Sequence, residues 1–190
     1  KDFMIEKLKQ IKLNAIVARI LHNKIKGYLV VCKNIFTIIT ISLPIIVTAV
    51  MYFGKGTEYQ ASTEILSFIM SISMIICSII YLTLNVDEKL YQNRLYASKN
   101  IDVANEIDKL LAQQEISEDL FNWFNRYVSE VDEKDNEILS GINDKHKRNA
   151  YRNALKEFEP GNYTIKCPIC DKSPWKYIPG NCQLCGNTKE

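Results

Sequence analysis

Four cysteines near the C-terminus carry the most specific chemical signal in this chain of 190 residues. They form two Cys-x2-Cys pairs, Cys167 with Cys170 and Cys182 with Cys185, and eleven residues separate the pairs. Two such pairs can place four thiolates around one ion at about 2.3 Å, the tetrahedral arrangement of a structural zinc site. We therefore predict a four-thiolate metal site with zinc as its cofactor, and redox iron is the second candidate.

A metal ion that four protein ligands surround has no open position for water or substrate, so we expect a structural role. The tail 160–190 has almost no apolar core, and zinc binding worth about 10–16 kcal/mol would supply its folding energy. Trp175, Tyr177 and Ile178 are expected to cover the metal. The chain has only two histidines and no local nucleophile–base pair, so we predict no catalytic residues and no enzymatic activity.

Two uncharged runs decide how the rest of the chain is organised. Residues 34–54 and 65–86 contain no Asp, Glu, Lys or Arg, and each run has 21 or 22 residues. A helix needs about 20 mostly apolar residues to cross the hydrocarbon of a bilayer. The sequence therefore predicts a transmembrane hairpin, and the turn 55–64 is too short to form an external domain.

The flanking charges predict the orientation of this hairpin. Residues 1–33 carry eight basic and two acidic side chains, and Lys89, Arg94 and Lys99 follow the second run. The turn between the runs contains a single lysine, Lys55. Because short flanks rich in Lys and Arg stay on the cytoplasmic side, both termini are expected in the cytosol.

Each predicted span carries one uncharged polar face. In the first span the face contains Thr37, Thr40 and Thr48, together with Pro44. In the second span Ser67, Ser71, Ser78 and Asn85 align. Such faces either let helices approach closely and bond across the interface or line a water-filled pore in an oligomer, and the sequence leaves both readings open.

The cytosolic part is predicted to be helical. Residues 3–24 form an amphipathic helix that packs on the bundle or lies on anionic lipid. A helix is expected to run straight on from the second span to a break at 113–116, and Ser117 then caps the next helix. A third helix is predicted over 134–158. The expected domains are 1–30 (amphipathic helix), 31–86 (hairpin), 87–159 (cytosolic helices) and 160–190 (zinc-ribbon-like module), which together make an all-α membrane protein.

A basic run lies in the third predicted helix. Lys145, Lys147, Arg148 and Arg152 could contact phosphates of lipid or nucleic acid. A charge run on a helix is most often a solvated face, and that reading is favoured here. Nucleic acid is therefore not an expected partner.

The combination of a basic amphipathic helix, a two-span hairpin and a cytosolic helical region resembles the SLATT superfamily of two-transmembrane effectors in prokaryotic conflict systems. The terminal Cys-x2-Cys-x11-Cys-x2-Cys pattern is similar to the one that names the mobilome CxxCx(11)CxxC proteins. The resemblance implies a homo-oligomer that permeabilises the bacterial inner membrane in antiviral defence, with a cytosolic sensor or signalling protein as a further partner. Only Cys167, Cys170, Cys182 and Cys185 carry over from the family pattern, because no catalytic residues define it.

A second function remains open at this point. The hairpin could serve as a membrane anchor only, while the cysteine module and the cytosolic helices dock a protein or nucleic-acid partner. A pore-forming effector is the favoured function, and it rests largely on the resemblance.

Overall fold

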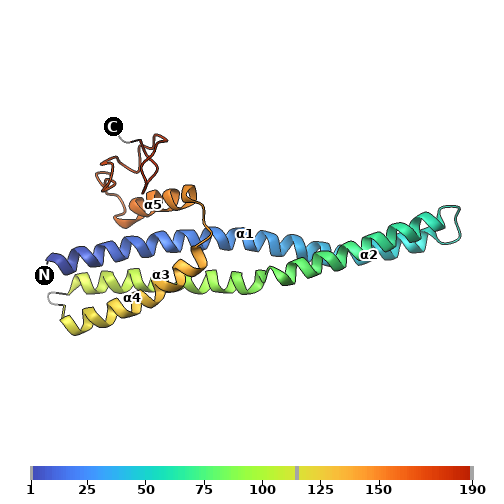
Figure 1. Cartoon of the computed structure of the whole chain (residues 1–190), viewed down its shortest axis with the longest axis horizontal. Helices are drawn as coiled ribbons and strands as arrows, with labels where there is room; N and C mark the ends of the chain where they lie inside the picture. The colour runs from blue at the N-terminus through green and yellow to red at the C-terminus, as the bar shows by residue number, and fades with distance from the viewer. Residues whose placement is uncertain (1, 114–115, 189–190) are drawn as a thin grey trace. The chain divides into compact units, whose positions relative to one another are not determined.

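The computed structural model of the chain describes residues 2–113 and 116–188. Its helices, labelled in Figure 1, are α1 (Asp2–Gly54), α2 (Gln60–Thr83), α3 (Val86–Ala112), α4 (Glu118–Leu139) and α5 (Asp144–Phe158). After α5 the described chain forms turns and loops, and its only β contact is an isolated bridge between Pro179 and Asn187. The predicted all-α fold with a C-terminal cysteine cluster is confirmed.

The chain divides into two compact units, which are described separately. One unit comprises residues 26–91, and the other comprises Lys1–Ile25 together with Gln92–Glu190. The cysteine segment that was expected to form a domain of its own, 160–190, belongs to the same unit as the helical bundle. This association was not predictable from local sequence patterns, because the residues that create it come from distant segments.

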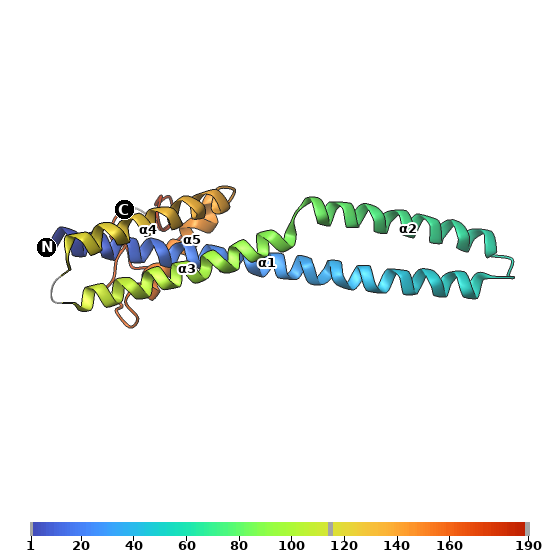
Figure 2. The ribbon, with the colours of Figure 1, turned by 90° about the horizontal axis from the view of Figure 1, so that it is seen from below.

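The unit 26–91 is a helical hairpin (Figure 2). The turn between α1 and α2 brings Gly54 against Thr63, and a Cβ on Gly54 would lie 2.3 Å from Thr63 Oγ1. Phe36 and Tyr81 stack between the two helices with ring centroids 4.0 Å apart. The Lys33 ammonium lies 2.7 Å from Asp87 Oδ1 and closes the opposite end of the hairpin.

The hairpin exposes its apolar side chains. Both helices are long and apolar enough to cross a membrane. Large side chains that a soluble protein would bury are more than half exposed, among them Ile38, Ile45, Phe53, Phe68 and Leu82. A continuous apolar surface of this kind is rare on soluble monomers and indicates contact with lipid or with other protein.

The predicted second span, 65–86, extends beyond the C-terminal end of the helix that forms. α2 ends at Thr83, and α3 begins at Val86. Asn85 lies between them with a left-handed φ of 48°, a conformation that Asn tolerates better than most residues. The prediction of one uninterrupted helix was therefore wrong, and Asn85 does not belong to the polar face of α2.

The second unit is a bundle formed by the N-terminal part of α1 and by α3, α4 and α5. Its largest core contains fully buried Leu8, Ile107 and Phe124 from three different helices. The predicted amphipathic helix therefore packs on the bundle through Leu8 and Ala15. The N-terminus of α4 begins as expected, because the Ser117 hydroxyl accepts a hydrogen bond from the Leu120 N–H.

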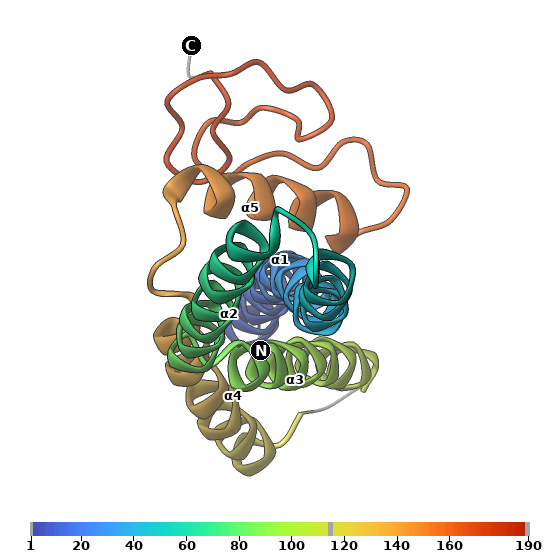
Figure 3. The same cartoon turned by 90° about the vertical axis from the view of Figure 1, so that its right-hand side faces the viewer.

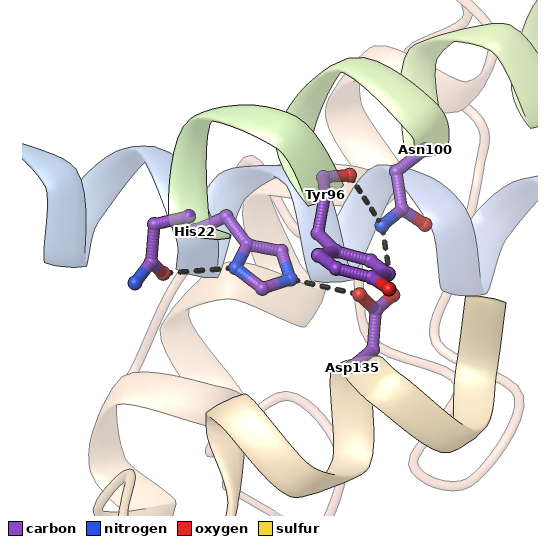
Figure 4. A network of polar contacts seen from close by, with 5 residues as sticks. His22, Tyr96, Asn100 and Asp135 are labelled. Atoms are coloured by element: carbon purple, nitrogen blue, oxygen red, sulfur yellow. Dashed lines mark hydrogen bonds and ion pairs between the residues drawn. The ribbon is translucent and has the colours of Figure 1, made fainter. Parts of the chain in front are cut away.

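A buried polar network connects three helices of this bundle (Figure 4). His22 of α1 lies between Asn93 of α3 and Asp135 of α4, with a distance of 2.9 Å from each ring nitrogen to an oxygen. Asn100 of α3 donates a hydrogen bond of 2.7 Å to the other oxygen of Asp135. Buried polar groups are costly unless they are paired, so this network favours one alignment of the three helices.

Two predicted helix boundaries in the bundle remain, one within 134–158 and one at 113–116. The single helix predicted over 134–158 is wrong, because α4 ends at Leu139 and Asn143 caps α5 by accepting from the Lys145 N–H. Ser140, Gly141 and Asn143 are weak helix formers, which explains the interruption. Of the predicted break at 113–116, residues 114 and 115 lie outside the described residues.

Candidate metal centre

The four predicted cysteines converge on one point. Their Sγ atoms all lie within 4.8 Å of one another, and Cys167, Cys182 and Cys185 are buried. Sγ of Cys167 is 3.9 Å from that of Cys182, and Sγ of Cys170 is 3.5 Å from that of Cys185. Four thiolates bound tetrahedrally at about 2.3 Å would be about 3.8 Å apart, so this donor set can hold a metal ion after small shifts of the sulfur atoms.

Each Cys-x2-Cys pair forms the same knuckle. The N–H of Asp171 donates to the Cys167 carbonyl at 2.9 Å, and the N–H of Gly186 donates to the Cys182 carbonyl at 3.0 Å. The residue that follows each pair is left-handed, with φ of 55° at Asp171 and 72° at Gly186. Glycine adopts this conformation readily because it has no Cβ, whereas Asp171 has the same conformation with a side chain that favours it less.

The knuckles direct backbone amides at the sulfur atoms. Burial raises the pKa of the Cys182 thiol, but hydrogen bonds from the N–H groups of Cys185 and Leu184 and from neighbouring thiols outweigh it and lower the pKa to about 6. Burial raises the pKa of Cys167 and Cys185. A cation in the centre would favour all four thiolates, because a coordinated thiol loses its proton.

The cover of the cysteines differs from the prediction. Trp175, Tyr177 and Ile178 were expected over the metal, but all three are more than two-fifths exposed. The cysteines pack instead against Leu155, which is buried, and against partly buried side chains from outside the motif. These side chains are Leu13 of α1, Tyr151 of α5 and Ile165, and Leu184 from within the second pair joins them.

This packing joins the cysteine module to α5, and the module lies beside that helix in Figures 1 and 3. Burial and the nearby thiols raise the pKa of Tyr151 to about 12, so its phenol stays neutral against the sulfur atoms. Spacing along the sequence could not reveal this cover, since Leu13 lies more than 150 positions before Cys167. The one signal in the sequence for this cover was an apolar stripe along α5 that includes Tyr151 and Leu155.

The eleven residues between the pairs fold back onto the second knuckle. The buried side chain of Asn187 accepts from the Ile178 N–H at 3.0 Å and donates to the Lys176 carbonyl at 3.2 Å. Gly180 donates to the Gly186 carbonyl at 2.9 Å. A Cβ on Gly180 would lie 2.3 Å from the Thr188 Cα, so this close approach requires glycine.

The predicted polar faces of the spans have different environments. Thr37, Thr40 and Thr48 are exposed on α1, while Ser67 is buried and Ser71 and Ser78 are half-buried on α2. The hydroxyl groups of all these residues except Ser67 donate to the carbonyl four residues earlier in their own helix. These hydroxyls therefore need no partner on another helix.

The predicted basic run is divided by the structure. Lys145 and Lys147 are exposed, and Arg148 is half-buried. Arg152 donates to the Cys185 carbonyl at 2.9 Å and to Asn149 Oδ1 at 2.8 Å. Arg152 therefore connects α5 to the second knuckle, a contact that its place in a charge run did not suggest.

The comparisons with known proteins agree with this architecture. The model of a family described as Mobilome CxxCx(11)CxxC protein matches residues 5–188, which include both spans and all four cysteines. Neither the curated proteins nor the solved structures give a match to the chain.

Proposed function

The chain belongs to the Mobilome CxxCx(11)CxxC protein family, and from this premise we propose that it is a membrane effector of a prokaryotic conflict system. On activation its hairpins assemble into a homo-oligomer that forms a pore in the bacterial inner membrane or disrupts it. Membership of the family indicates a protein associated with mobile elements, and the membrane activity is our inference from the hairpin.

The observation that carries this proposal is the contrast between the two units. The bundle buries its apolar residues in three cores. In the hairpin, by contrast, none of the most apolar segment of α1 is buried, and only 6% of the most apolar segment of the second span is buried. A hairpin with this surface needs lipid around it, and its helices can satisfy their backbone groups there without a partner. The Lys- and Arg-rich flanks support cytosolic placement of both termini.

The burial of the polar faces favours α1 as the pore-lining helix. Ser67, Ser71 and Ser78 lie on the face of α2 that is at least partly covered within the hairpin. Thr37, Thr40 and Thr48 are open on α1 and can face water or another subunit. We therefore refine the proposal to a pore lined by the threonine face of α1.

The cysteine centre is proposed to hold zinc in a structural role. Its four thiolates, the backbone N–H groups around them and the apolar cover from α5 suit a closed tetrahedral ion. Cys167, Cys170, Cys182 and Cys185 would bind the ion, which would fold the loops 162–188 onto α5. Because all four ligand positions would be filled by cysteines, the ion would have no open position for a substrate. We therefore propose that the protein is not an enzyme.

Release of a dye from liposomes tests the pore. The purified chain should release a small dye, and the triple variant Thr37→Val, Thr40→Val, Thr48→Val should release it several-fold more slowly at equal reconstitution. Ser73→Ala with Thr83→Val is the matched control, since these exposed hydroxyls also bond their own helix but lie off the threonine face. Membranes that stay tight with the wild-type oligomer would refute the proposal.

A membrane anchor is the second candidate. The intrahelical hydrogen bonds of the span hydroxyls favour it, because a face with satisfied donors requires no water. Replacement of residues 34–83 by an unrelated two-span hairpin separates the two functions. An anchor keeps its biological effect after this exchange, whereas an effector that forms its own pore loses it.

A further inference from the structure

A basic cleft lies where α5 meets the second knuckle. Its volume is about 550 Å³, and loop residues 177–186 form one of its walls. The polar side chains that line it are Lys24, Lys145, His146, Arg148, Asn149 and Arg152. Four of these six carry a positive charge, and no acidic residue of the described chain lines the cleft.

The cations of this cleft have few partners. Within residues 2–113 and 116–188, Lys24, Lys145 and Arg148 form no ion pair. The Nε atom of Arg148 is buried and has no hydrogen-bond partner there. A buried guanidinium donor without an acceptor is costly, so an acceptor bound at this position would stabilise it, and an anionic acceptor would also offset its charge.

Two further features make the cleft rigid and positive. Arg152 is fixed by its hydrogen bonds to Cys185 and Asn149, and its guanidinium lies 3.6 Å from the centre of the Tyr177 ring. Lys145 and His146 belong to the first turn of α5, where the helix dipole adds positive potential.

We propose that this cleft binds a phosphate-bearing anion. Guanidinium groups match phosphate oxygens in geometry, and several converging cations suit a group with two or more negative charges. The volume lies in the range of small-molecule sites and exceeds what one phosphate fills, so the ligand carries a further group. The phosphate belongs either to a free small molecule or to a lipid headgroup, and the same side chains contact both.

The inference concerns residues of the bundle unit alone and does not depend on pore formation. It is tested with the full chain, purified in detergent with its metal, by calorimetric titration at low ionic strength. One titration uses sodium pyrophosphate, and a second compares short-chain phosphatidic acid with short-chain phosphatidylcholine. Binding of pyrophosphate supports a free ligand, and binding of phosphatidic acid alone supports a headgroup.

Three variants give the residue-level test. Lys145→Ala and Arg148→Gln should each weaken binding by about tenfold or more, as expected for a lost charge-assisted hydrogen bond. Lys147→Ala removes the same charge from the same helical run but lies outside the cleft, so it should change affinity by less than about twofold. Lys145 is exposed, so its variant remains informative if Arg148→Gln loses helicity or metal.

Two results would overturn the inference. One is the absence of binding to both pyrophosphate and phosphatidic acid by the wild-type chain. The other is an equal loss of affinity in Lys147→Ala and Lys145→Ala, because that pattern indicates diffuse attraction to a charged helix and no defined site.

Discussion

The imidazole Nε2 of His22 lies 2.9 Å from Asp135 Oδ1, and both side chains are buried. These residues are 113 positions apart in the chain, so the contact is possible only when α1 and α4 are correctly aligned. Asn93 and Asn100 of α3 occupy the remaining polar positions around the pair. The network can therefore form only when all three helices are aligned correctly with one another.

Removal of one member should destabilise the bundle strongly. His22→Ala and Asp135→Ala are each expected to lower the free energy of unfolding by about 2–4 kcal/mol, because the remaining partner stays buried without its hydrogen bond. Chemical denaturation of the detergent-purified chain, followed by circular dichroism, measures the loss. Glu137→Ala is the control, since its exposed ion pair with Lys134 should contribute less than about 1 kcal/mol. Similar losses in all three variants would contradict the role of the network.

Asp132 should make stability depend on pH. Partial desolvation and then the neighbouring Asp135 carboxylate raise the pKa of Asp132 above its ordinary value. A carboxyl group with a raised pKa in the folded state holds its proton more tightly there, so the contribution of Asp132 to stability is most favourable at acidic pH and falls as pH rises through the folded pKa. Asp132→Asn should therefore raise the melting temperature near neutral pH.

The gain from Asp132→Asn is expected to stay below about 1 kcal/mol, because solvent screens this side chain. The difference between the two proteins should shrink toward acidic pH, where the wild-type carboxyl group is also neutral. Melting curves over a pH series measure it. A difference that is independent of pH would show that the charge of Asp132 is not its cause.

Removal of the metal should unfold the cysteine module but leave the hairpin intact. A strong chelator or Cys167→Ser should expose Leu155 and Tyr151, since the knuckles that cover them lose their crosslink. Faster hydrogen exchange in 162–188 and increased proteolysis there would report this change. Cys32→Ser and Cys77→Ser are the matched controls, because both cysteines are exposed in the hairpin.

The cover of the metal can be tested by truncation. Leu155→Ala should destabilise the docked module by about 2–5 kcal/mol, because this side chain is buried against the cysteines. Trp175→Ala should cost much less, since Trp175 is 42% exposed. Competition with a chromogenic chelator gives the metal affinity of each variant. If Trp175→Ala lost more metal affinity than Leu155→Ala, the result would support the prediction from sequence that Trp175 covers the metal.

Substitutions at the left-handed residues of the two knuckles should change stability in opposite directions. Asp171→Gly should stabilise the module by about 0.5–1 kcal/mol, because glycine adopts the left-handed φ of 55° without strain. Gly186→Ala should destabilise it by a comparable or larger amount, because it adds a side chain at φ of 72°. Thermal unfolding of the metal-loaded chain checks both signs. Stabilisation by Gly186→Ala would contradict the proposed equivalence of the knuckles.

The local features of this protein were determined by the sequence. Uncharged runs of 21 or 22 residues can satisfy their backbone only as helices in an apolar medium, so the hairpin followed from composition and length. The spacing Cys-x2-Cys fixes how two thiolates reach one ion, so the four candidate ligands could also be predicted from the sequence. The Ser117 cap was predictable for the same reason, because a helix cap depends on residues close together in the chain.

Only the tertiary structure decided what these parts contact. The cover of the cysteines by Leu155 and Leu13, the pairing of His22 with Asp135 and the cleft around Arg148 all join residues from distant segments. The break at Asn85 also escaped prediction, since its flanking residues favour a continuous helix by pattern. Local spacing limits the conformations of a segment, whereas contacts between segments depend on how complete helices pack, and a single sequence without its fold does not specify that packing.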